Sequence, residues 1–109
     1  MKRTAELPVI GMDIAKNVFH IHLVDVENGE KRLKLKRSQV APFFANSQPA
    51  LVAMEACGSA HYWGRTLQAQ GHQVKLLPPT QVKPFVVRDK TDVRDAQAIW
   101  VAAQQPHIR

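Results

Sequence analysis

Cysteine, aromatic residues and long hydrophobic runs are scarce in this sequence of 109 residues. Its single cysteine, Cys57, excludes an internal disulfide and a cysteine-based zinc site, which is typical of a reducing compartment, and we expect its side chain to be buried. No stretch reaches the roughly 18 apolar residues of a membrane-spanning helix. The apolar run after Glu6 is interrupted by Pro8 and is too short for a signal peptide. The sequence therefore predicts a cytoplasmic protein rather than a membrane-spanning or secreted one.

Acidic residues are outnumbered by basic ones. The chain has 15 Lys and Arg residues against 9 Asp and Glu residues, so its formal net charge is +6. A positive balance favours polyanionic partners, although many proteins of this charge bind no nucleic acid. The content of 45% hydrophobic and 22% charged residues is close to the globular average, so we expect a folded chain with one modest core. The length allows one domain, residues 1–109, which we interpret as a fragment of a larger protein.

Hydrophobic patterning predicts a mixture of strands and helices. Strict alternation from Val18 to Val26 is typical of a half-buried strand, and Asn28-Gly29 is a strong hairpin signal before the next strand. Ser38 is the expected N-cap of the first helix, and Gly71 is the expected left-handed cap of the second. The predicted elements are strands 7–14, 18–26 and 31–37, a helix 39–46, a strand 50–54, a helix 60–70, a strand 74–77, a partly helical segment 81–88 and a helix 92–104. This order implies an α/β fold with helices layered on a mixed sheet.

Four carboxylates occupy positions at which they could converge. Asp13 and Glu55 end two predicted strands, and they would meet at one edge of the sheet if those strands were adjacent and parallel. Asp92 and Asp95 begin the last helix at a spacing that places both on one face. Converging carboxylates repel one another, and a hard divalent cation such as Mg²⁺ relieves that repulsion. Two such ions, about 3.5 to 4 Å apart, support phosphodiester cleavage.

Each of the four acids also has an interpretation without catalysis. Carboxylates in the first turn of a helix cap free N–H groups and oppose the helix dipole, which accounts for Asp92 and Asp95. Glu55 is also consistent with a solvated loop, and Asp13 with a turn. The residues alone leave both interpretations open.

Basic residues cluster in the third predicted strand and near the last two acids. Residues 31–37 contain five cations, and Arg32, Lys34 and Lys36 share one strand face. Such a face either binds nucleic acid or protects an exposed sheet edge, and the two interpretations have equal weight. Further candidates for phosphate contacts, each with a solvated side chain as the alternative, are Lys16, Lys83, Arg88 and Lys90.

Two pairs of ring-bearing residues have structural and functional interpretations. His20 and His22 share a strand face without an evident carboxylate partner, so we expect packed or solvated side chains rather than metal ligands. Tyr62 and Trp63 are possible stacking partners for a nucleobase, but helical spacing indicates that at least one of them belongs to the core. Neither pair by itself indicates a function.

Three segments resemble the signatures of the DEDD transposases of bacterial insertion sequences, a type guided by a bridge RNA. The segments are Gly11-Met12-Asp13-Ile14-Ala15-Lys16, Met54-Glu55-Ala56-Cys57-Gly58 and Lys90-Thr91-Asp92-Val93-Arg94-Asp95-Ala96. The resemblance extends over nearly the whole chain, and Lys-Thr-Asp-x-x-Asp-Ala is its most specific part. It implies a ribonuclease H-like fold close to that of the Holliday-junction resolvase RuvC, with the four carboxylates as the catalytic and metal-binding residues.

The resemblance also implies an activity and partners. Such transposases cleave and rejoin DNA with Mg²⁺ or Mn²⁺, and we expect DNA, a guide RNA and further copies of the full-length bacterial protein as partners. Cys57 stands where the family more often has Thr. The family's C-terminal domain, which carries a serine nucleophile, has no counterpart here, and Ser38, Ser47 and Ser59 do not replace it. The chain would therefore hold half of a composite active site.

Two other classes of function stay open. One is a non-catalytic nucleic-acid-binding or assembly module whose acids only cap and solvate. The other is half of an actin-like or sugar-kinase ATPase, since Gly11-x-Asp13-x-x-Lys16 at a first strand also suits nucleotide phosphates. The chain lacks the glycine-rich phosphate loop that would support this second class.

If the basic strand contacts phosphates, the affinity for nucleic acid should fall with salt concentration. The log-log slope is about −0.9 per neutralised phosphate on duplex DNA, so losing one contact should make the slope shallower by about that amount. A fluorescence anisotropy titration at several salt concentrations would compare the wild type with Lys34→Ala and Lys36→Ala. Unchanged slopes in both variants would show that the strand only protects an edge.

Overall fold

The computed structural model describes residues 7–14, 17–25, 29–86 and 92–105, with the side chains of residues 25 and 92–94 outside this description. The elements in chain order are β1 (Val9–Ile14), β2 (Val18–Asp25), β3 (Gly29–Lys36), α1 (Arg37–Ala45), β4 (Leu51–Glu55), α2 (Gly58–Ala69), β5 (Gln73–Leu77), α3 (Pro79–Val82), the 3-10 turn η2 (Lys83–Phe85) and α4 (Asp92–Ala103). Each predicted strand and helix has a counterpart whose ends differ by a few residues. No helix in the described ranges has the length and apolar character needed to cross a membrane.

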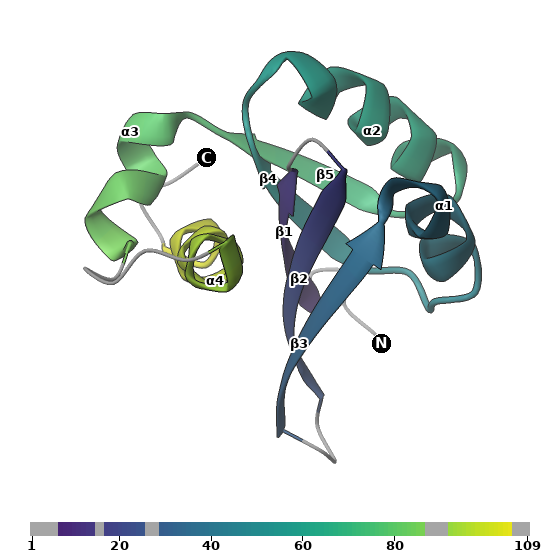
Figure 1. Cartoon of the computed structure of the whole chain (residues 1–109), viewed down its shortest axis with the longest axis horizontal. Coiled ribbons are helices and arrows are strands. Elements are labelled where there is room, and N and C mark those ends of the chain that lie inside the picture. The colour runs from purple at the N-terminus through teal and green to yellow at the C-terminus, as the bar shows by residue number, and fades with distance from the viewer. Residues whose placement is uncertain (1–6, 15–16, 26–28, 87–91, 106–109) are drawn as a thin grey trace, which may run out of the picture.

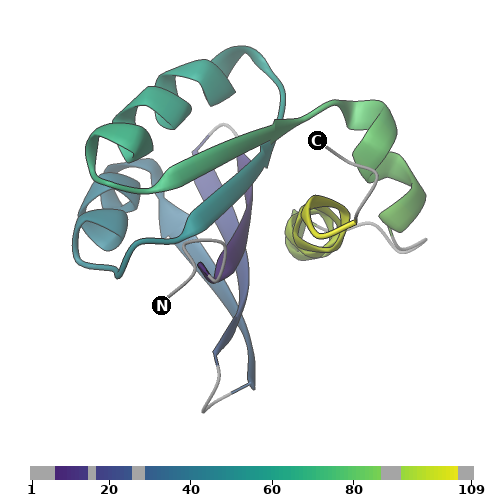
Figure 2. The same ribbon diagram turned by 180° about the vertical axis from the view of Figure 1, so that it is seen from behind.

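The five strands form one mixed sheet in the order β3-β2-β1-β4-β5. β2 lies antiparallel between β1 and β3, and its pairing with β3 is the one that the hairpin signal predicted. β4 pairs in parallel with β1 on one side and β5 on the other. Figures 1 and 2 show α1 and α2 on one face of this sheet and α4 on the other. The α/β layers expected from the order of the elements are therefore confirmed.

Alternation along the strands supplies an apolar core to each face of the sheet. Beneath α1 and α2, the strands bury large side chains that include Met12, Phe19 and Ile21, each at most 1% exposed. Full burial of one such side chain stabilises the fold by about 1.5 to 3 kcal/mol. The core beneath α4 is smaller and consists of Ala53, Leu77, Val82, Ala98, Ile99, Ala102 and Ala103. β4 is buried on both faces, as its uninterrupted apolar run predicted.

α4 makes a close contact with the sheet where it crosses β1. A Cβ atom placed on Gly11 would lie 2.5 Å from the carbonyl oxygen of Ala96 and 2.9 Å from the Cβ atom of Trp100. The backbone of α4 therefore rests directly on the backbone of β1. The indole N–H of Trp100 donates a 2.9 Å hydrogen bond to the carbonyl oxygen of Val9, which fixes the helix further along the same strand.

Two local predictions are wrong, and a third is confirmed. α1 follows β3 without a connecting residue, so its N-cap is Lys36, and Ser38 lies inside the helix. The backbone N–H of Lys36 donates a 2.8 Å hydrogen bond to the side-chain oxygen of Gln39. Cys57 is exposed, because it lies at the surface where the chain leaves the buried part of β4 and enters α2. Gly71, just beyond α2, has a φ of +97°, which confirms the left-handed cap.

Gly11→Ala is expected to destabilise the fold, because the added methyl group would collide with backbone atoms of α4. Overpacking of this kind costs about 1 to 3 kcal/mol, so the midpoint of urea-induced unfolding should fall. Gly58→Ala is the matched control, since a Cβ atom there meets nothing within 4 Å and alanine is the better helix former. Equal midpoints for Gly11→Ala and the wild type would contradict the close contact.

Candidate functional site

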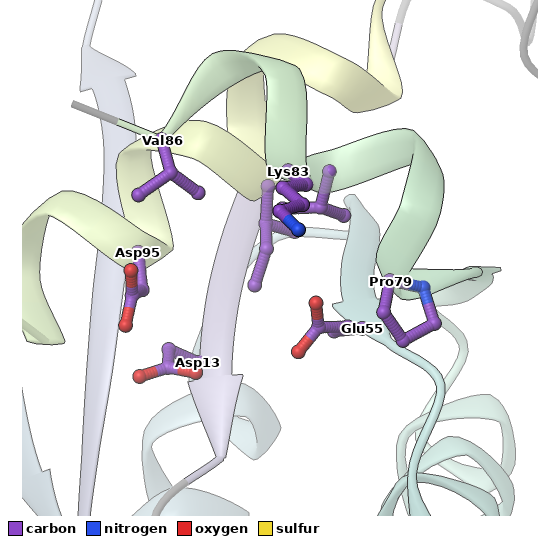
Figure 3. A pocket seen from close by; sticks show the side chains of 8 residues that line it. Asp13, Glu55, Pro79, Lys83, Val86 and Asp95 are labelled. Carbon is purple, nitrogen blue, oxygen red and sulfur yellow. The ribbon is translucent and has the colours of Figure 1, made fainter. Parts of the chain in front are cut away.

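A cavity of about 230 Å³ lies at the carboxyl ends of β1 and β4, the two central parallel strands. Its polar lining consists of three carboxylates and one ammonium group: Asp13 of β1, Glu55 of β4, Asp95 of α4 and Lys83 of η2. The remaining lining is apolar and comes from Pro79, Val82, Val86 and Ile99. Figure 3 shows the three carboxylates around one space. Three of the four predicted acids thus share a cavity.

Strand pairing brings Asp13 and Glu55 together. β1 and β4 are parallel neighbours in which Met12 lies opposite Met54, and the two acids are the next residues of their strands. Both methionines point into the core beneath α1 and α2, so the acids that follow them face the side of α4. Each acid is partly buried. The predicted condition for their meeting, adjacent parallel strands, is therefore fulfilled.

Asp95 reaches the cavity because of the path that α4 takes across the sheet. The contact of Ala96 with Gly11 places the first turn of the helix near the end of β1. Asp95, in this first turn, is partly buried and lines the cavity with Asp13. Asp92 is the first residue of α4, but its side chain is outside the described residues, so its role as a ligand stays a prediction.

Lys83 adds a positive charge to the lining. The segment that carries it is anchored by the neighbouring Val82, which is buried in the core beneath α4. The exposed Lys83 side chain extends over the cavity, and Figure 3 shows its nitrogen on the side of Glu55. A cation beside carboxylates offsets part of their repulsion and can attract a phosphate. The sequence did not indicate that residues 79–86 cover the acids, because this segment has no clear periodicity.

The three carboxylates share a cavity without forming a tight cluster. Within the part of the chain that the structure describes, no group of three His, Cys, Asp or Glu side chains is close enough to hold a metal ion. Carboxylate oxygens are the donors that Mg²⁺ and Mn²⁺ prefer. The chemistry of the lining therefore fits such an ion, while the spacing of its side chains is wider than a bound ion requires.

The predicted basic face lies on β3, which is one of the two edge strands of the sheet. Arg32, Lys34 and Lys36 are all exposed. Lys34 lies opposite His20, and His20 lies opposite Asp13, so the basic face and the cavity are on the same side of the sheet. This position is compatible with both edge protection and phosphate contact. Three other predicted contacts lie outside the described residues: Lys16, Arg88 and Lys90.

His22 has a carboxylate neighbour that the sequence pattern did not indicate. The His22 side chain is fully buried, and its Nε2 atom lies 3.1 Å from a carboxylate oxygen of Glu30 on β3. Its ring lies edge-on to the indole of Trp100, with the ring centroids 5.2 Å apart. In the register of β2 and β3, Glu30 lies opposite Val24, two residues from His22 on the same strand face. A two-residue turn at Asn28-Gly29 would instead pair His22 with Leu35, so the predicted turn did not reveal this neighbour. His20 is also buried, at 8% exposure, so the expected packing of both histidines is confirmed.

The sheet order and the helices on its faces define a ribonuclease H-like fold. A solved structure of Thermus thermophilus RuvC matches with a TM-score of 0.59 and 14% sequence identity, over 94% of this chain and 99% of RuvC. A second structure, of T. thermophilus RuvC in complex with a Holliday junction substrate, matches with a TM-score of 0.55 and 14% identity, over 89% of this chain and 92% of that one. These similarities establish the fold.

The chain belongs to the DEDD transposases of the IS110 family, whose family model matches residues 10–108. A Pseudomonas aeruginosa protein named "Probable family 20 transposase" is 54% identical over 101 residues, which are 92% of this chain and 30% of that protein. The transposase for insertion sequence element IS1328 of Yersinia enterocolitica is 43% identical over 101 residues, again 92% of this chain and 30% of the relative. The chain thus spans 30% of the length of these curated relatives, and the resemblance inferred from its three motifs is confirmed.

The stability of the fold should depend on the protonation of His22. Burial is the main cause that lowers the pKa of His22 below its ordinary value of 6.5. The charge of Glu30 raises this pKa by a smaller amount, and the charge of Arg32 lowers it further. The unfolded chain therefore binds a proton on His22 more readily than the folded protein does. The stabilisation that depends on neutral His22 is fully present above pH 6.5. The free energy of unfolding then decreases as the pH falls from 6.5 toward the lowered pKa.

Urea unfolding at several pH values between about 7.5 and 5 would measure this dependence, which is limited to about 1.4 kcal/mol per pH unit for one proton. The wild type should lose stability more steeply on acidification than His22→Gln, which has no titrating ring. If the stability of the two proteins changed with pH in parallel, the lowered pKa of His22 would be contradicted.

Proposed function

We propose that this chain is the N-terminal catalytic domain of an insertion-sequence transposase and that its four carboxylates bind Mg²⁺ or Mn²⁺ for DNA cleavage. The four are Asp13, Glu55, Asp92 and Asp95. The observation that carries the proposal is the shared cavity, in which carboxylates from β1, β4 and α4 line one space. Helix capping does not explain Asp13 and Glu55, since Asp13 is the penultimate residue of β1 and Glu55 is the last residue of β4. Carboxylates collected at one place favour a bound cation, because they otherwise repel one another.

The residues of the cavity suit this role in different ways. The ladder between β1 and β4 holds the backbones of Asp13 and Glu55 side by side, while α4 supplies Asp95 from a third direction. Rotation about their side-chain torsions can move the carboxylate oxygens inward to a shared ion. When bound, such an ion would supply an activated water molecule and stabilise the leaving oxygen of a phosphodiester.

Cations around the acids would orient the substrate. Lys83 extends over the cavity, where its ammonium group can attract the phosphate that is to be cleaved. The basic face of β3, on the same side of the sheet, would contact backbone phosphates further along the strand through Arg32, Lys34 and Lys36. Lys16, Arg88 and Lys90 are proposed to extend these contacts from the segments that flank the acids.

DNA is the substrate that the family and the fold favour. The relatives are named transposases, and one of the RuvC structures contains a Holliday junction substrate. The resemblance of the motifs adds a guide RNA and assembly with further copies of the full-length protein. A serine nucleophile would come from outside these 109 residues. We therefore propose metal binding for this chain and strand cleavage with rejoining for the full-length transposase.

A non-catalytic nucleic-acid-binding or assembly module is the second candidate. Its starting point is the spacing of the carboxylates, since no three potential ligands among the described residues lie within reach of one ion, whereas the family model and the named relatives favour the transposase. In such a module Asp95 would oppose the dipole of α4, and the basic strand would carry the function.

Mn²⁺ is expected to bind at the cavity. In an amide NMR titration, low concentrations of this paramagnetic ion should first broaden the signals around Asp13, Glu55 and Asp95, because the broadening falls steeply with distance. Asp13→Asn and Asp92→Asn should each abolish the selective loss of signals, since each removes a charged ligand. Glu30→Gln is the matched control, because Glu30 pairs with Val24 of β2 at the end of the sheet opposite to the cavity.

The control variant should show the same selective broadening as the wild type. Uniform broadening, or selective broadening that persists in Asp13→Asn and Asp92→Asn, would contradict the metal site. Either result would favour the binding module.

A further inference from the structure

Tyr62 is an exposed aromatic side chain on α2. Among the described residues, the exposed large hydrophobic side chains are Tyr62, at 55%, and Val24, at 44%. The next residue, Trp63, is only 4% exposed, which confirms that one member of the aromatic pair belongs to the core. α2 therefore turns one aromatic ring into the protein and presents the adjacent one to the solvent.

The ring of Tyr62 is held in place by the buried ring beside it. The centroids of the Tyr62 and Trp63 rings lie 5.1 Å apart, with the ring planes at 85°. Trp63 packs in turn on Phe19 of β2, with centroids 5.3 Å apart and planes at 75°. Edge-to-face pairs of this kind attract one another and restrict ring orientation. Tyr62 thus offers an exposed aromatic surface that is already oriented.

Arg37 adds a positive charge to the same group of rings. Its guanidinium carbon lies 5.6 Å from the ring centroid of Phe19 and 6.0 Å from that of Trp63. The Arg37 side chain is exposed, and its backbone N–H donates a 3.2 Å hydrogen bond to the carbonyl oxygen of Asn17. A guanidinium group stacks on rings and binds phosphate through paired N–H groups, so both functions are available to Arg37.

This aromatic and basic group lies at the same end of the sheet as the carboxylate cavity, but on the other face. In the register of β1 and β2, Phe19 lies opposite Ile14, and the adjacent His20 lies opposite Asp13. Phe19 points toward α2, whereas Asp13 lines the cavity on the side of α4. A nucleic-acid strand bound at the cavity therefore needs only to pass around the end of the sheet to reach Tyr62.

We propose that Tyr62 and Arg37, supported by Trp63, form a stacking site for an unpaired nucleobase. The base stacks on Tyr62, and the neighbouring phosphate contacts Arg37. Nucleotides of DNA and RNA both have an aromatic base and a backbone phosphate, the two groups that such a pair recognises. The exposed apolar surface is one ring. Arg65 follows Tyr62 by three residues on α2, and Arg37 lies over the Trp63 ring that contacts Tyr62, so exposed cations near the ring favour a polyanion over a protein partner. The proposal rests on the nucleic-acid substrate of the proposed function.

The test measures binding of single strands of about 12 nucleotides, within the range covered by single-strand-binding domains, by fluorescence anisotropy in EDTA. The probes are oligothymidylate, oligouridylate and an abasic strand of the same length and charge. Tyr62→Ala should weaken binding of the strands with bases about tenfold and leave binding of the abasic strand unchanged. Tyr62→Phe should bind like the wild type, because it retains the ring. A larger loss for oligouridylate would assign the base to RNA, and a larger loss for oligothymidylate would assign it to DNA.

Val24→Ala is the matched control, since it removes the other exposed hydrophobic side chain, and it should bind all three probes like the wild type. Arg37→Gln should make the salt dependence shallower by about 0.7 in log-log slope, the value for one phosphate of a single strand, whereas Lys31→Gln should not. The proposal is overturned if Tyr62→Ala binds like Val24→Ala, if it weakens the abasic strand equally, or if the wild type binds none of the strands. EDTA removes metal ions, so the anisotropy measurement does not depend on the proposed Mn²⁺ site. If Mn²⁺ did not bind, the effect of Tyr62→Ala on the strands with bases would still be expected.

Discussion

The contact of α4 with the backbone of β1 at Gly11 governs the geometry of one whole face of the sheet. Without a side chain at Gly11, the helix lies against the strand itself, and its first turn brings Asp95 to the end of β1. Farther along the helix, Trp100 is hydrogen-bonded to β1, and the ammonium group of Lys75 donates a 3.2 Å hydrogen bond to the carbonyl oxygen of Ala103. A helix held at both ends cannot shift without moving the cavity.

The two faces of the sheet serve different purposes because strand residues alternate between them. The face beneath α1 and α2 buries large apolar side chains and supplies most of the core. The face beneath α4 carries polar residues on every central strand, including Asp13, His22 and Glu55. Small residues of α4, such as Ala98 and Ala102, allow the helix to pack closely over this polar face. The fold therefore separates the side chains that stabilise it from those available for chemistry.

Much of the fold was predictable because its signals are local. Alternation identified β2, an uninterrupted apolar run identified β4, and the positive φ of Gly71 agrees with its predicted role after α2. The errors occurred where a local preference met a tertiary constraint. Ser38 is a good N-cap, but β3 leads straight into α1, so the helix begins two residues earlier than a Ser38 cap would allow. Cys57 is apolar enough to be buried, yet the path from β4 to α2 leaves it at the surface.

The order of the elements, the faces of the strands and the positions of Asp13 and Glu55 at strand ends can all be read from the amino-acid sequence. These features follow from the period of two along a strand, from turn residues and from apolar runs, all of which depend on near neighbours. Two features depend on how the chain packs: Asp95 and Lys83 line one cavity with these acids, and Arg37 lies over the rings of Phe19 and Trp63. These contacts join segments that are far apart in the chain. They depend on how the helices pack against the sheet, and no local sequence pattern encodes that packing.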